Sequence, residues 1–342
     1  MEELSPREKL ILRFTVNSFI STGLPVGSRV LWKNYKLDIC PATIRNVMFD
    51  LEETGLLEHP YTSAGRVPTD KGFRIYIEDL VQYEKLTERE KRTITEYIES
   101  IKNNIDDLLK KTSLVLGKLS KQLGVVLTPN FYGGIFEKVE LVDISSNKIL
   151  VIITLKAGLF KTIIIEIDSY IPKSELEETA RVINERLYGL TLGEIKNTID
   201  RRLKDVSEVN EGIIRYFVEY SEHIFEIEWE EDVHLGGTKD IVEQPEFTSS
   251  EYLRKIFNLL EDKKTIINIF KKRKNEDKIT VTIGKENVDT NIDIFSVVTT
   301  VYKIGDVKGT LGIIGPRRMR YSKVIPIVKY TAKMLNKAVN TN

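Results

Sequence analysis

The feature that most limits the fold of this chain is the order of patterns in residues 1–80. Three short helical patterns come first, and two short extended pieces, LLEHP and RVP, follow around the polar turn YTSAG. Ser5 and Pro6 open the first helix, Ser28 is expected to cap the second, and Pro41 opens the third. Thr69 is expected to cap the helix after the hairpin. Three helices followed by a basic hairpin predict an N-terminal winged helix-turn-helix.

The third helix, CPATIRNVMFDLEETG, divides into an apolar and a polar side. The apolar side contains Ile44, Val47, Met48 and Leu51, and we expect it to pack on the other helices. Thr43, Arg45 and Asn46 are left facing outward, together with Phe49. Arginine can donate two hydrogen bonds to guanine, and asparagine can pair with adenine. The spacing therefore predicts a helix that reads DNA bases, although plain helical packing remains the competing interpretation.

The charge of the chain is balanced, because Lys+Arg and Asp+Glu both number 51. Residues 1–80 contain ten Lys or Arg and eleven Asp or Glu, which gives 10 − 11 = −1. The cations nevertheless gather in residues 27–49 and 59–74, whereas the acids gather in DLEETGLLE. One face of a neutral domain can therefore be positive and attract phosphate.

The sequence contains no recognisable catalytic motif. The single cysteine, Cys40, lies in the segment assigned to DNA reading, and the three histidines lack metal-ligand spacing. We find no phosphate-binding or dinucleotide-binding glycine motif, and expect neither a cofactor nor a metal site. No secretory signal and no apolar run long enough for a membrane span are recognised. We expect a cytoplasmic, non-enzymatic protein with no membrane partner.

The remaining sequence indicates an α+β multidomain chain. Residues 87–123 carry isoleucines and leucines at helical spacing, which is typical of packing against a core or a partner helix. Antiparallel hairpins are expected from the patterns that follow. Strands are predicted near 135–144, 148–155, 160–168, 279–284, 294–304 and 308–315, and helices near 174–222, 249–274 and from about 322.

Several strings resemble one known family. PVGSRVL and ATIRNVMFDLEETGLLEHPYTSAGRVPTDKGFRIYI closely resemble the heat-inducible transcription repressor HrcA family. The similarity returns in LGVVLTP, QPEF, IGKEN and GTLGIIGPRRMRY, so it spans nearly the whole chain. Members of that family often have serines where this chain has Cys40 and Pro41, and an acidic residue where Arg320 stands.

This resemblance implies a homodimer that represses chaperone operons by binding an inverted-repeat operator in double-stranded DNA. It implies a winged-helix domain in residues 1–85, a GAF-like domain in 86–134 and 226–342, and an inserted dimerisation domain in 135–225. A GroEL-type chaperonin is expected to promote the active form. The residues expected to contact DNA are Ser28, Arg29, Thr43, Arg45, Asn46, Tyr61, Ser63, Arg66 and Lys71.

Two other functions remain open on the sequence. A small-molecule-responsive regulator would use the GAF-like domain as its sensor, but no set of residues specifies a ligand. An enzyme would use the helix-turn-helix for protein contact. A ligand that raises the melting temperature would favour the first, and an activity without DNA binding would favour the second.

Overall fold

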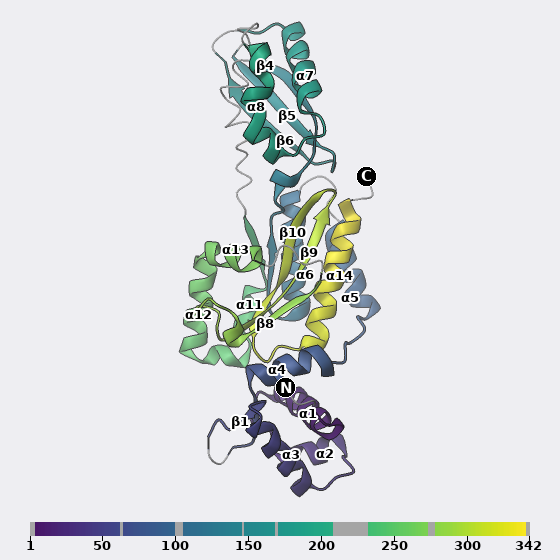
Figure 1. Ribbon diagram of the computed structural model, residues 1–342, viewed down its shortest axis with the longest axis vertical. Coiled ribbons are helices and arrows are strands. Elements are labelled where there is room, and N and C mark those ends of the chain that lie inside the picture. Colours follow the sequence, from purple (N-terminus) through teal and green to yellow (C-terminus); the bar gives the residue numbers. More distant parts are fainter. Residues whose placement is uncertain are drawn as a thin grey trace. The chain divides into compact units, whose positions relative to one another are not determined.

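The computed structural model describes residues 4–61, 64–99, 105–145, 147–167, 170–207, 232–272 and 278–339 (Figure 1). The chain divides into two compact units. The first contains residues 1–126, 233–301 and 311–334, and the second contains residues 127–232, 302–310 and 335–342. The described ranges contain helices and three separate sheets, which confirms the predicted α+β class with more than one domain. The predicted domain boundaries remain predictions.

The amino-terminal module, residues 4–80, begins with α1 (Pro6–Thr22), α2 (Ser28–Tyr35) and α3 (Pro41–Glu53). Ser5 and Glu8 form a capping box in which each side chain accepts the other residue's backbone N–H. The prediction that Ser28 caps α2 is wrong. Gly27 occupies that position, because the extended backbone of the preceding turn ends there (φ −98°, ψ 152°) and Ser28 is already helical. The buried core of the module includes Ile11, Leu12, Val16, Leu31, Ile44, Met48 and Leu51.

A short hairpin follows α3, as the sequence predicts. β1 (Leu57–Glu58) pairs antiparallel with β2 (Val67–Pro68). Thr69 then caps α4 (Asp70–Ile75) by accepting a hydrogen bond of 3.0 Å from the N–H of Gly72. A β-carbon at Gly72 would lie 2.1 Å from the carbonyl oxygen of Leu56, so only glycine lets α4 approach the hairpin this closely. The chain continues as a π-helical turn over Tyr76–Leu80.

A five-stranded sheet, mostly in the first unit, has the strand order β7-β3-β10-β9-β8. β10 pairs antiparallel with β3, and β8 pairs antiparallel with β9. Nearly every residue of β3, β9 and β10 is buried, which is the pattern of a sheet covered on both faces. The strands are β3 (Leu123–Leu127), β7 (Val233–Gly236), β8 (Thr280–Ile283), β9 (Phe295–Ile304) and β10 (Val307–Pro316).

Helices of the first unit pack on this sheet (Figure 1). α6 contacts both α5 and β7, and a β-carbon at Gly236 of β7 would lie 2.3 Å from the carbonyl oxygen of Ser113 in α6. Helix and strand backbones therefore touch at this point. The helices are α5 (Glu88–Glu99), α6 (Ile105–Ser120), α11 (Thr238–Val242), α12 (Ser250–Glu261), α13 (Lys263–Lys271) and α14 (Tyr321–Val339). No described helix has the length and apolar character needed to cross a membrane.

The second unit contains an antiparallel sheet of β4 (Phe136–Ser145), β5 (Lys148–Leu155) and β6 (Phe160–Glu166). β5 alternates between buried and half-buried residues, so one face of this sheet is covered and the other is open. α7 (Lys173–Leu187) packs on β4, and α8 (Leu192–Ser207) packs on α7. The side chain of Asn184 fastens α7 to the sheet by bonding both the N–H and the carbonyl of Val139, at 2.6 and 3.0 Å.

Candidate nucleic-acid interface

α3 presents a polar surface opposite its apolar side. Ile44, Val47, Met48 and Leu51 are buried against the module, as the helical spacing predicts. On the opposite side Arg45 and Asn46 are exposed, and Thr43 is half-buried. Phe49 is 52% exposed and extends this surface by one turn. The guanidinium of Arg45, the amide of Asn46 and the hydroxyl of Thr43 can thus form hydrogen bonds with the edges of bases.

The start of α3 carries the only cysteine of the chain. Cys40 is exposed and occupies the N-cap position, where its side chain makes no capping bond. Its Sγ lies 3.3 Å from Oγ1 of Thr43, and this hydrogen bond lowers the pKa of the thiol below 9.0. The first backbone N–H groups of α3 therefore have no side-chain cap. Such groups, at the positive end of a helix dipole, can bind phosphate.

α2 begins beside this surface with further polar groups. Arg29 is exposed and Ser28 is half-buried. Lys33 and Lys36, one turn later and just after α2, are also exposed. These cations and Arg45 of α3 are all exposed, and exposed cations can attract phosphate even though residues 1–80 carry a net charge of −1.

The hairpin projects from the end of α3. Tyr61, next to its tip, is 63% exposed, while Ser63 lies outside the described residues. The backbone of Arg66 pairs with that of Val26 at 2.8 and 2.9 Å, which ties the returning strand to the turn before α2.

Arg66 and Lys71 have internal partners rather than free cationic ends. Nη2 of Arg66 lies 2.8 Å from Oε2 of Glu52 in α3, and the Arg66 side chain is only 13% exposed. Nδ1 of His59 lies 2.6 Å from the other oxygen of Glu52. Lys71 donates a 2.8 Å hydrogen bond to the carbonyl of Thr54, at the end of α3. Both cations therefore hold the hairpin region on α3, which the sequence alone does not reveal, and their contact with DNA remains a prediction.

The ionisation of Glu52 reflects this arrangement. Burial favours the neutral acid, but the hydrogen bond with His59 and the positive charge of Arg66 outweigh it. The pKa of Glu52 is therefore lowered from its ordinary value of 4.5. At neutral pH the carboxylate is charged and accepts both bonds.

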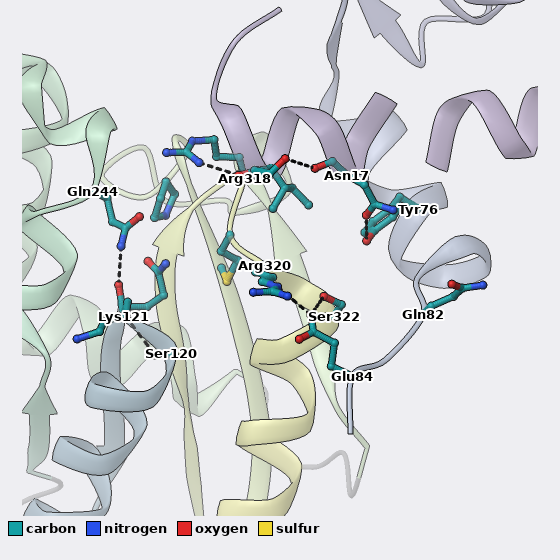
Figure 2. Close-up of a pocket in the computed structure, with 15 residues that line it drawn as sticks. Asn17, Tyr76, Gln82, Glu84, Ser120, Lys121, Gln244, Arg318, Arg320 and Ser322 are labelled. Carbon is teal, nitrogen blue, oxygen red and sulfur yellow. Dashed lines mark hydrogen bonds and ion pairs between the residues drawn. The ribbon is translucent and has the colours of Figure 1, made fainter. Parts of the chain in front are cut away.

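A cavity of about 660 Å³ lies between α1 and the end of β10, inside the first unit (Figure 2). Most of the residues that line it are polar, and the buried Oε1 of Gln122 has no hydrogen-bond partner among the described residues. The cations that line it already have carboxylate partners. Lys121 pairs with Asp240, Arg318 with Glu246 and Arg320 with Glu84. Within the described residues, no three His, Cys, Asp or Glu side chains are grouped to hold a metal.

Comparisons with known proteins give a consistent family. Residues 106–325 match the model described as the HrcA protein C terminal domain. The heat-inducible transcription repressor HrcA of Chlorobium chlorochromatii is 38% identical over 342 residues, which cover 99% of this chain and 98% of the relative. That of Syntrophobacter fumaroxidans is 34% identical over 98% of this chain and 97% of the relative.

A solved structure shares the fold. The crystal structure of a hypothetical protein has a TM-score of 0.63 to this chain, with 23% identity and 99% coverage of both chains. The full-length identity above 30%, together with the match of the carboxy-terminal model, settles the relationship. The chain belongs to the HrcA family of heat-inducible transcription repressors.

Proposed function

We propose that the protein represses transcription by binding an inverted repeat in double-stranded DNA through a winged helix formed by residues 1–85. The observation that carries this proposal is the two-sided character of α3. Arg45 and Asn46 are exposed, whereas Ile44 and Val47, their neighbours in the chain, are buried. A helix held in this way can insert its exposed side into a major groove about 12 Å wide.

The predicted contacts divide into two roles. Thr43, Arg45 and Asn46 read bases, and Ser28 and Arg29 hold phosphate at the start of α2. The hairpin contacts the backbone beside the groove through Tyr61 and Ser63. In this account Arg66 and Lys71 contribute mainly by fixing the hairpin on α3, since each already has a partner there.

An inverted repeat has two-fold symmetry, so we propose that the protein binds it as a homodimer. The open face of the β4-β5-β6 sheet supports this step. Val142, Leu150 and Ile164 lie in one row across the three strands, and Val142 and Ile164 are 44% and 58% exposed. Exposed apolar rows of this kind mark interaction surfaces. Ile164→Lys should shift the protein from dimer to monomer in analytical ultracentrifugation, and an unchanged dimer would reject this surface.

The function is tested by a gel shift on an inverted repeat from the gene's own upstream region, with scrambled DNA of equal length beside it. We expect one complex that contains two protomers, and an affinity for the repeat about 10³-fold or more above that for scrambled DNA. Equal affinity for the two duplexes would reject the proposal.

The dependence on a GroEL-type chaperonin is a further part of the proposal. Chaperonin raises the fraction of folded, DNA-binding dimer, so heat or loss of chaperonin relieves repression. Titration of chaperonin into the gel shift should increase the active fraction of a heat-treated sample. An unchanged active fraction would remove this step.

The cavity between α1 and the end of β10 favours a second candidate function, in which a GAF-like domain makes the repressor respond to a small molecule. Its volume of about 660 Å³ lies within the range of ligand pockets. A ligand that binds the folded state raises stability by RT ln(1+[L]/Kd). A thermal-shift screen of metabolites tests this candidate, and operator affinity that stays constant with a bound metabolite would exclude a regulatory role.

A further inference from the structure

Four segments that are far apart in the sequence meet where the amino-terminal module contacts the five-stranded sheet, all within the first unit. They are TDKGFR in α4, QPEF before α12, IGKEN after β8 and GPRRMRY after β10. The contacts among them are polar. Asp70 meets Arg317, Arg74 meets Glu286, and Arg318 meets Glu246. We call this set of contacts the junction.

Arg318 is the most enclosed cation of the junction. Its side chain and that of Glu246 are each 14% exposed, and Nη2 of Arg318 lies 3.2 Å from Oε2 of Glu246. Nη1 donates a 2.8 Å hydrogen bond to the carbonyl of Ile20, in the last turn of α1 (Figure 2). The last four carbonyls of a helix lack intrahelical donors and attract cations. Arg318 therefore attaches the end of α1 to the sheet.

Asp70 forms a second attachment. Its carboxylate accepts hydrogen bonds from Nη1 of Arg317 at 2.9 Å and from the N–H of Lys285 at 3.0 Å. Gly284 makes room for it, because a β-carbon there would lie 2.3 Å from Oδ2 of Asp70. Nearby, Arg74 donates a 2.7 Å hydrogen bond to the carbonyl of Val281. α4 is thus fixed by directional bonds to the end of β8 and the turn that follows it.

Two cavities interrupt the packing of the junction. Arg318 lines both the cavity of about 660 Å³ and a second cavity of about 330 Å³. Phe73 makes one of the apolar contacts, with a ring centroid 6.1 Å from that of Tyr321. Apolar contacts are not directional, whereas two bonded arginines that approach from the same loop restrict rotation.

We propose that Arg318 and Arg317 are positioning residues for operator binding, which hold the direction of α3 relative to the rest of the first unit. This inference rests on the proposed function, since a fixed direction matters when two modules must reach two half-sites together. Simultaneous engagement raises affinity by about 10²–10⁴-fold and is lost when the geometry forbids it. A rigid junction makes affinity depend steeply on half-site spacing, and a loosened junction flattens that dependence.

The test compares operators whose half-sites are separated by 0 to about 5 additional base pairs, the latter being half a helical turn. Wild-type protein should lose about 10²-fold in affinity across this series. Arg318→Gln should bind the natural spacing more weakly and lose less than about tenfold across the series. Its affinity for a single half-site should equal that of wild type, because no DNA-reading residue has changed.

Arg317→Gln provides a milder second variant, because its side chain is 40% exposed and Asp70 keeps the bond from Lys285. Arg92→Gln is the matched control, since Arg92 is 80% exposed and pairs with Glu96 on the same helix, away from the junction. The control should keep the wild-type spacing profile. A steep, unchanged profile in both junction variants would overturn the inference while leaving the proposed function intact. Wild-type protein that does not prefer the inverted repeat would instead reject the proposed function.

Discussion

Arg66→Ala separates two roles for the hairpin arginine. In the structure Nη2 of Arg66 lies 2.8 Å from Glu52, and the two side chains are 13% and 27% exposed. An exposed ion pair contributes about 0–1 kcal/mol, and breaking a buried pair costs about 3–5 kcal/mol. This pair is partly buried, and Glu52 retains its bond with His59. We therefore expect Arg66→Ala to lower the local free energy of unfolding by about 1–3 kcal/mol.

Hydrogen exchange of the backbone amides in residues 57–68 measures this local free energy. Glu52→Gln should speed exchange in the same residues, because it removes the charge that Arg66 pairs with. The salt dependence of operator binding gives the second reading. A lost phosphate contact lowers the slope of log K against log salt by about one. We expect Arg66→Ala to lower this slope by less than one. Unchanged exchange together with a slope lower by about one would refute this account of Arg66.

Three further variants or conditions test other parts of the structure. Arg45→Ala should weaken operator binding by about 1–3 kcal/mol and relax preference at one base pair, as measured by gel shifts on substituted half-sites. Normal binding at moderate salt would reject Arg45 as a base-reading residue. The lowered pKa of Glu52 stabilises the fold at pH values above 4.5, and this contribution is lost as pH falls through the lowered pKa. Glu52→Gln should therefore remove part of the acid-dependent rise in hairpin exchange, and an unaltered pH profile would contradict this. Gly284→Ala should cost about 1–3 kcal/mol in urea unfolding, because Gly284 has φ 52° and faces Asp70. Gly284→Ala should cost less in a protein that also carries Asp70→Ala. If the effects of the two substitutions on the free energy of unfolding simply add, Gly284 and Asp70 are not in contact.

Local patterns predicted much of the fold. Helical spacing placed Ile44, Val47 and Leu51 inside the module, and the structure confirms these positions. Turn residues placed the hairpin correctly, because LLEHP and RVP can pair only across the YTSAG turn. The cap of α2 was missed by one residue, since glycine and serine both suit the N-cap position.

The contacts between distant segments were not predictable. Arg66 and Glu52 are separated by 14 residues, and Arg318 and Glu246 by 72, so no local periodicity connects them. The strings QPEF, IGKEN and GPRRMRY resemble one family, and only the fold brings them together. Their charged residues are the one sequence signal for the junction, because charged side chains need partners when they are buried.

The central claim is that the exposed side of α3 meets operator DNA, and Cys40 tests it directly. This thiol is the only one in the chain, is exposed, and stands at the start of α3. The measurement is its rate of alkylation by iodoacetamide in the presence of saturating operator or an equal concentration of scrambled duplex. If the exposed side of α3 meets operator DNA, operator should slow alkylation strongly and scrambled DNA should not. An equal rate in free protein and in the operator complex would contradict it.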